Sequence, residues 1–176
     1  MMFPRPVVAL VALLWLALGA GAQQPEATAT PATPPLAAGD AVPAFEAQGL
    51  NGVSYTVEFP KDGPTTVLLV FLASCPHCRA MLPIWSVAFD KKPERLKVQA
   101  IMLDEAPPGF FSFHKVSFPV LRAVDRRDVS HKLKVNRVPM TVRIKPGGLV
   151  EDVVQGELDP ERLGQLFKAG TGTSGS

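Results

Sequence analysis

The two cysteines of the chain, Cys75 and Cys78, are the residues best suited to chemistry, and only Pro76 and His77 separate them. Two thiols at this spacing can form and break a disulfide with each other, and no other cysteine competes for either of them. A bridge between them would close too short a loop to stabilise a fold appreciably. The pair therefore suits a catalyst of thiol–disulfide exchange better than a structural link.

The roles of the two thiols follow from a helix that the pattern predicts to start at the cysteines, with Ser74 as a candidate N-cap. Unpaired backbone N–H groups and the positive end of the helix dipole favour a thiolate at Cys75. The thiolate is the form that attacks a disulfide. We predict that Cys75 attacks and that Cys78, one turn further, resolves the mixed disulfide. His77 is expected to support the thiolate by a hydrogen bond or a positive charge.

Other uses of the two sulfurs stay open on the residues alone. The pair could be a purely structural bridge, or it could hold Cu(I) or Zn(II) together with His77, because soft sulfur ligands select these metals. A structural zinc site needs four ligands, and His114 and His131 lie far away in the sequence. A peroxidase and a non-catalytic binding module are further alternatives. The peroxidase lacks support because the pattern Pro-x-x-x-Thr-x-x-Cys does not occur.

Apolar patterning predicts alternating strands and helices around the dithiol. Residues 65–72 form an uninterrupted β-branched and aliphatic run, which suits a central strand covered on both faces. The helix that follows carries an apolar stripe with Met81 and Trp85, and Pro83 is expected to kink it. Further strands are expected at 96–103, 118–124, 141–144 and 149–154, and further helices at 107–116, 128–135 and from Asp159-Pro160 onward. This order predicts an α/β domain with a mixed sheet.

The amino-terminal residues indicate export from the cytoplasm. Arg5 precedes an apolar run at 7–22 that ends in a small-x-small cleavage pattern. At about 1.5 Å per residue this run is shorter than the roughly 30 Å hydrocarbon core, so a signal peptide is expected and an uncleaved anchor is the alternative. The predicted parts are a signal peptide at 1–22, a Pro/Ala/Thr-rich linker at 23–38, one domain at 39–169 and a disordered tail at 170–176. The formal net charge of +2 is too small to indicate a nucleic-acid partner.

Several segments, in the same order, resemble thioredoxin-fold proteins of the TlpA/ResA or redoxin type. The matching segments are the opening at 39–45 with its turn at 50–52, the strand, CxxC and helix unit at 67–83, the Arg-Val-Pro-Met-Thr segment at 137–141, and the Gly147-Gly148 hairpin. The CxxC motif alone has moderate specificity, but the ordered set is strong. The resemblance covers nearly all of residues 39–169.

The resemblance implies an α/β, thioredoxin-like fold of three layers, in which a central mixed β-sheet is flanked by helices. It also implies an extra strand and helix inserted between Cys78 and Pro139. It implies that Cys75 and Cys78 form a catalytic disulfide. Pro139 is expected to follow a cis bond, and Val138 to offer backbone groups to a bound substrate peptide. The residues expected to support catalysis are Pro76, His77 and Pro139.

Two features depart from this group. Pro76-His77 between the cysteines, and Val138 before the proline, are what DsbA proteins carry, so scaffold and active-site dipeptide resemble different relatives. Leu69 occupies roughly the position at which thioredoxin buries an acidic residue that assists proton transfer. Asp104-Glu105 is interpreted as the solvated end of a strand, with no assigned role.

The resulting expectation is a periplasmic or secreted thiol–disulfide oxidoreductase whose partners are client proteins with cysteine thiols or disulfides. A membrane thiol–disulfide electron donor is a candidate second partner. The scaffold favours a reductase slightly over an oxidase. A copper metallochaperone and an oxidative disulfide donor of DsbA type are the alternatives. No cofactor, resident metal or nucleic acid is expected.

Overall fold

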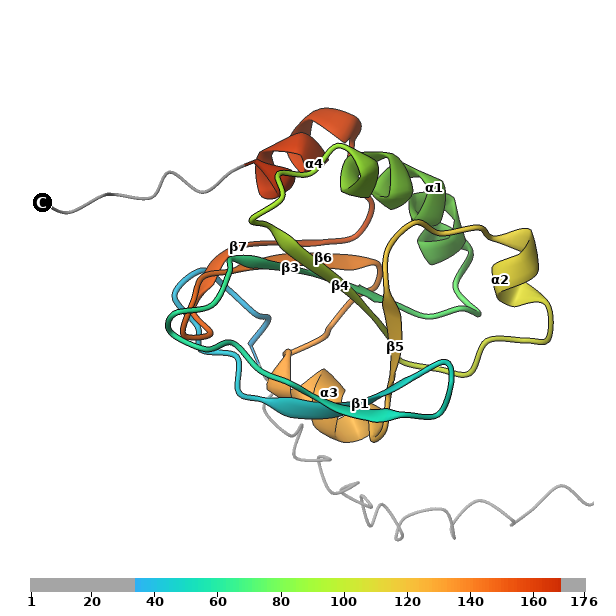
Figure 1. Ribbon diagram of the computed structural model, residues 1–176, viewed down its shortest axis with the longest axis horizontal. Coiled ribbons are helices and arrows are strands. Elements are labelled where there is room, and N and C mark those ends of the chain that lie inside the picture. The colour runs from blue at the N-terminus through green and yellow to red at the C-terminus, as the bar shows by residue number, and fades with distance from the viewer. Residues whose placement is uncertain (1–33, 169–176) are drawn as a thin grey trace, which may run out of the picture. The chain divides into compact units, whose positions relative to one another are not determined.

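A mixed sheet forms the centre of the structure, a computed structural model that describes residues 34–168 (Figure 1). Within these residues seven strands pair in the order β2-β1-β5-β4-β3-β6-β7. The strands are β1 (Phe45–Gly49), β2 (Ser54–Val57), β3 (Thr66–Phe71), β4 (Lys97–Met102), β5 (Val120–Ala123), β6 (Met140–Ile144) and β7 (Val150–Gln155). The predicted signal peptide, most of the predicted linker and the predicted tail lie outside the described residues.

The central strand β3 is buried along its whole length, as its apolar run predicts. It pairs in parallel with β4 and antiparallel with β6. Successive side chains of a strand point to opposite faces of the sheet. Accordingly Val67, Leu69 and Phe71 pack into one hydrophobic cluster, while Leu68 and Val70 pack into the other. Both faces of the sheet therefore need a covering layer.

Helices on the two faces supply these layers, which confirms the predicted three-layer α/β fold. The helices are α1 (Pro76–Asp90), α2 (Phe110–Phe113), α3 (Arg126–Lys132) and α4 (Pro160–Phe167). Side chains of α1, α2 and α4 pack into the first cluster, whereas Val129 of α3 packs into the second. In Figure 1, α1 and α4 lie together on one side of the sheet and α3 lies on the other.

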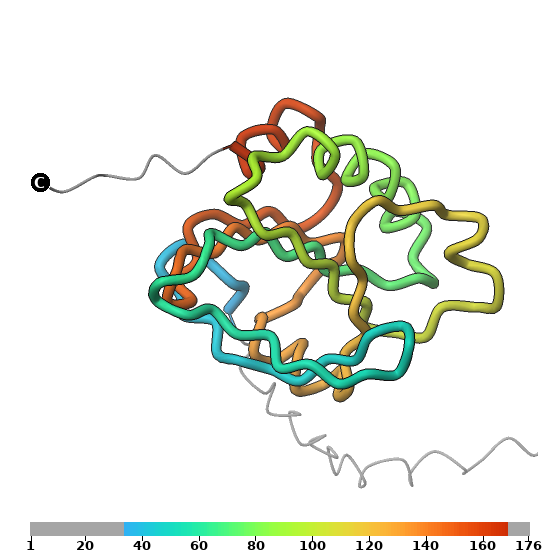
Figure 2. The backbone as a smooth tube through the Cα atoms, viewed as in Figure 1, coloured from blue at the N-terminus to red at the C-terminus, as the bar shows by residue number. Residues whose placement is uncertain are grey.

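The extra strand and helix predicted by the resemblance are present. Between α1 and β6 the chain forms β4, α2, β5 and α3. Strand β5 pairs in parallel with β4 and antiparallel with β1, so a segment from the middle of the chain lies beside one from its beginning. Figure 2 shows the path of the backbone through these segments.

Some predicted boundaries differ from the observed ones for local reasons. The helix predicted at 107–116 is only four residues long, because two prolines and Gly109, at φ 77°, precede it. Helix α3 begins at Arg126, two residues before the predicted start, because the Asp125 side chain accepts the N–H groups of Arg127 and Asp128. Leu36, inside the range predicted as linker, is buried in the second cluster.

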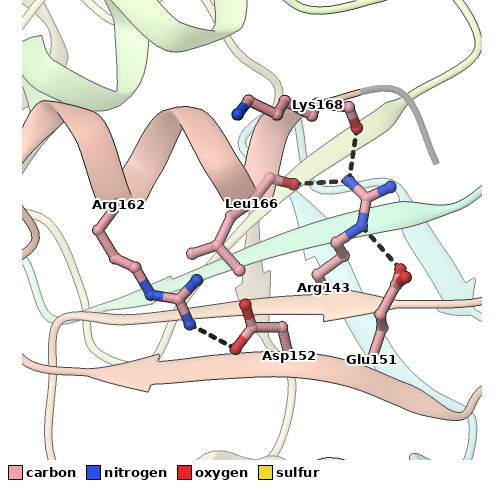
Figure 3. A network of polar contacts seen from close by, with 6 residues as sticks. All are labelled: Arg143, Glu151, Asp152, Arg162, Leu166 and Lys168. Atoms are coloured by element: carbon pink, nitrogen blue, oxygen red, sulfur yellow. Dashed lines mark hydrogen bonds and ion pairs between the residues drawn. The ribbon is translucent and has the colours of Figure 1, made fainter. Parts of the chain in front are cut away.

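The end of α4 is tied to the sheet by Arg143 of β6 (Figure 3). This side chain is almost fully buried. Its Nε donates to Glu151 at 2.7 Å, and its Nη1 donates to the carbonyls of Leu166 at 2.6 Å and Lys168 at 2.8 Å. The helix starts as predicted, with the Asp159 carboxylate accepting from Arg162 N at 2.8 Å. The two termini of α4 are thus both satisfied by side chains.

Between residues 34 and 168, no helix has the length and apolar character that crossing a membrane requires.

Candidate functional site

The two cysteines lie where the central strand ends and α1 begins. Cys75 is the N-cap residue of α1, with extended backbone angles of φ −81° and ψ 122°. The prediction that Ser74 caps this helix is wrong, because the cap position lies one residue later and makes no side-chain hydrogen bond. Pro76 occupies the first helical turn, where its fixed φ suits a helix and its missing N–H costs nothing. Cys75 thus lies at the N-terminus of α1.

The two thiols differ sharply in their surroundings. Both are free in this structure, so it shows the dithiol form. Cys78 is fully buried among apolar side chains of the first cluster, whereas Cys75 is half-buried. Only Cys75 can therefore meet the disulfide of another protein without a rearrangement of the core.

Burial raises the pKa of the Cys78 thiol from 9.0 to about 12. A hydrogen bond and charge interaction with Cys75 and the negative charge of Asp104 act in the same direction, while a backbone hydrogen bond from Leu72 opposes them. Cys78 consequently holds its proton at neutral pH. It becomes a nucleophile only when its proton is removed, which suits a resolving thiol better than an attacking one.

His77 is exposed at the beginning of α1, and its ring contacts a carboxylate. Its Nδ1 lies 2.6 Å from Oε1 of Glu157, in the loop between β7 and α4. The two side chains keep 70% and 55% of their surface accessible, so solvent screens the interaction. The support of the Cys75 thiolate by His77 stays a prediction, and any positive charge on the ring has the Glu157 carboxylate beside it.

The peptide bond between Val138 and Pro139 is cis. Val138 is half-buried and packs against the same cluster as Cys75. Its own backbone N–H and C=O make no hydrogen bond to other groups in residues 34–168. Pro139 is buried, and its carbonyl accepts from Gly156 N at 2.7 Å. The Pro139 carbonyl thus holds the loop, while the backbone N–H and C=O of Val138 are available to a binding partner.

Asp104 belongs to this site, although the sequence interpretation assigned it no role. Its Oδ1 accepts the N–H of Ala73 at 2.6 Å and its Oδ2 accepts the N–H of Ser74 at 3.0 Å. From the other side, Arg79 Nη1 donates to the carbonyls of the same two residues at 3.2 and 3.1 Å. One sequence signal could have indicated this role of Asp104. It follows an apolar strand that is parallel to the central strand, and parallel strands end at the same edge of a sheet.

The centre of the sheet carries no acidic side chain at the position considered in the sequence. Leu69 is fully buried there, opposite Ala100 of β4 and Thr141 of β6. Thr141 accepts a hydrogen bond from Trp85 Nε1 at 3.2 Å. Among residues 34–168, no group of three or more His, Cys, Asp or Glu side chains could hold a metal ion.

Comparison with known proteins places the chain among thiol–disulfide oxidoreductases. No family model matches. The chain is 29% identical over 132 residues to the thiol–disulfide oxidoreductase ResA of Oceanobacillus iheyensis, covering 71% of this chain and 68% of that protein.

Solved structures show the same relationship at the level of the fold. A putative thiol:disulfide interchange protein DsbE from Chlorobium tepidum superposes with a TM-score of 0.59 at 25% identity, covering 74% of this chain and 95% of that one. StoA from Bacillus subtilis superposes with a TM-score of 0.60 at 17% identity, covering 71% and 96%. Sequence and fold comparisons therefore lead to the same kind of protein: the chain has a thioredoxin-like fold and is similar to thiol–disulfide oxidoreductases of the ResA and DsbE kind.

Proposed function

We propose that the protein is a periplasmic or secreted oxidoreductase that exchanges disulfides with cysteines of client proteins through Cys75 and Cys78. The asymmetry of the two thiols carries this proposal. Cys75 is accessible at a helix N-terminus, and Cys78 is buried with a pKa of about 12. An accessible nucleophile and a shielded resolving thiol are what a two-step exchange requires.

In the reducing direction, the Cys75 thiolate attacks a client disulfide, forms a mixed disulfide and releases one client thiolate. Cys78 then loses its proton and attacks the Cys75 sulfur, which releases the second client thiolate. Two electrons pass to the client, two protons complete its thiols, and the protein keeps the Cys75–Cys78 disulfide. The oxidising direction is the reverse of these steps. Val138 would align the client backbone through its free N–H and C=O.

A reductase is slightly favoured over an oxidase. Stabilising the thiolate makes a disulfide more oxidising, from about −270 mV in thioredoxin to about −120 mV in DsbA. The Glu157 carboxylate offsets the positive charge that His77 would bring to the thiolate. The CPHC motif is therefore expected to be less oxidising here than its sequence indicates. A membrane electron donor would then regenerate the dithiol.

An extracytoplasmic location is supported by the apolar run at 7–22 behind Arg5. The run lies outside the described residues. Sequencing the amino terminus of the protein recovered from a periplasmic fraction tests this part. A mature chain starting at Gln23 supports the predicted signal peptide, while a retained Met1 in a membrane fraction supports the anchor.

Selective alkylation tests the assigned roles. At pH 7.5 the pKa of Cys78 leaves about a thousandfold less thiolate than an unperturbed value of 9.0 would. Iodoacetamide should therefore modify Cys75 first. Cys78→Ser should accumulate a mixed disulfide with a client or with glutathione, and Cys75→Ser should form none. Equal alkylation of both thiols, or trapping by Cys75→Ser, contradicts the assignment.

The reduction potential decides the direction of exchange. It is measured by equilibrating the protein with glutathione and counting free thiols by mass after alkylation. A value of about −250 mV or below supports a reductase. A value between about −180 and −120 mV identifies a disulfide donor of DsbA type or an isomerase and overturns the preference.

A further inference from the structure

The segment that leads into the dithiol is held by two side chains, one from α1 and one from the residues just after β4. Ala73 and Ser74 connect β3 to Cys75, and neither lies in a strand or helix. Asp104 accepts both of their backbone N–H groups, and Arg79 donates to both of their carbonyls. All four backbone polar groups of this dipeptide are thus satisfied by one carboxylate and one guanidinium.

The fold brings Asp104 to this point through strand register. Phe71, the last residue of β3, lies opposite Met102, the last residue of the parallel strand β4. The N–H of Leu103 still donates to the Phe71 carbonyl at 2.9 Å. The two backbone segments therefore separate only after Leu103. Asp104 is the next residue, and it is half-buried. Its carboxylate is therefore placed by the sheet, not by a flexible loop.

The charge of Asp104 acts differently on the two redox forms. In the disulfide form neither sulfur carries a charge, so the carboxylate has little to interact with. In the dithiol form the carboxylate, which accepts the N–H of Ser74 next to Cys75, disfavours a thiolate on Cys75. Cys78 keeps its proton at neutral pH, so its own raised pKa does not shift the equilibrium there. Arg79, which donates to the carbonyls of the same two residues, brings a positive charge to this segment. An exchange of aspartate for a neutral residue leaves that positive charge in place.

We propose that Asp104 is a positioning residue for thiol–disulfide exchange, which holds the Ala73–Ser74 segment and biases the Cys75–Cys78 pair toward the disulfide by its negative charge. The inference rests on the proposed function. A carboxylate just after β4 would then act on the dithiol, whereas the central strand has the apolar Leu69 at the position considered in the sequence.

The test compares Asp104→Asn with Glu105→Gln. Asparagine keeps one acceptor oxygen and removes the charge. Glu105 is the adjacent carboxylate, is exposed and pairs with Arg122, so it serves as the matched control. Each protein is equilibrated with glutathione, in which one protein disulfide and two glutathione thiols give the protein dithiol and one glutathione disulfide. We expect the equilibrium constant of Asp104→Asn to move about tenfold toward the dithiol, which is about 30 mV.

Glu105→Gln should stay within about twofold of the wild type. Asp104→Glu, which restores the charge and both acceptor oxygens, should return most of the shift. If Asp104→Asn does not fold, Asp104→Glu and the rate of Cys75 alkylation in it carry the comparison. Wild-type potential from Asp104→Asn, or an equal shift from Glu105→Gln, overturns the inference. Failure of the wild type to equilibrate with glutathione would instead reject the proposed function.

Discussion

Two arginines in different regions of the molecule each donate two hydrogen bonds from one nitrogen to backbone carbonyls. Arg143 Nη1 donates to the carbonyls of Leu166 and Lys168 at the end of α4 (Figure 3), and Arg79 Nη1 donates to those of Ala73 and Ser74 before the dithiol. Arg143 is 5% exposed, whereas Arg79 is only half-buried. Because the two guanidinium groups make similar hydrogen bonds but differ in burial, removing them should change stability by different amounts.

Burial decides what is lost when either guanidinium is removed. Around Arg143 the carbonyls of Leu166 and Lys168 and the Glu151 carboxylate would lose a donor that is almost fully buried, and a buried acceptor such as the Leu166 carbonyl is costly to leave without a partner. Around Arg79, water can replace the guanidinium. We therefore expect Arg143 to contribute mainly to stability, and Arg79 to contribute little to stability and to act mainly on the dithiol.

The largest expected effect is on stability, from Arg143→Met. The substitution should lower the free energy of unfolding by about 3 kcal/mol, because it leaves Glu151 and two carbonyls without their donor. Urea denaturation followed by circular dichroism measures it. The control is Asp152→Asn, which breaks the half-exposed pair with Arg162 and should cost about 1 kcal/mol or less. If Arg143→Met lowers the free energy of unfolding no more than Asp152→Asn does, burial of Arg143 does not make it more important for stability.

An intermediate effect is expected from Arg79→Met. Methionine suits a helix, so the free energy of unfolding should fall by about 1 kcal/mol or less. The loss of positive charge beside the dithiol should move the glutathione equilibrium about threefold toward the disulfide, opposite in sign to the effect of Asp104→Asn. Both quantities come from the measurements already described. A shift toward the dithiol would show that Arg79 does not act on the thiols through its charge.

The smallest effect is expected from Glu157→Gln, which neutralises the exposed partner of His77. The free energy of unfolding should change by less than about 0.5 kcal/mol. The glutathione equilibrium should move toward the dithiol, by less than with Asp104→Asn, and the shift should shrink further in 1 M salt. Equilibration at low and high salt measures this. An effect as large as that of Asp104→Asn, and independent of salt, would mean that exposure does not limit the influence of Glu157.

Local patterns predicted most of the elements, because those patterns are set by neighbours in the chain. The apolar run at 65–72 has to be covered on both faces, and Asp159-Pro160 can start a helix from its own side chain and ring. Helix ends were less predictable. The stretch at 107–116 contains apolar residues throughout, but its prolines and the left-handed Gly109 shorten the helix.

By itself the sequence determined the dithiol, the strand and helix that present it, and the resemblance that led to the thioredoxin fold. Tertiary structure alone decided which charges act on that dithiol. Asp104 lies 30 residues from Ser74, and Glu157 lies 80 residues from His77. Spacing along the chain carries no signal for such contacts, because they exist only once strand register and the β7–α4 loop have brought distant backbone segments together.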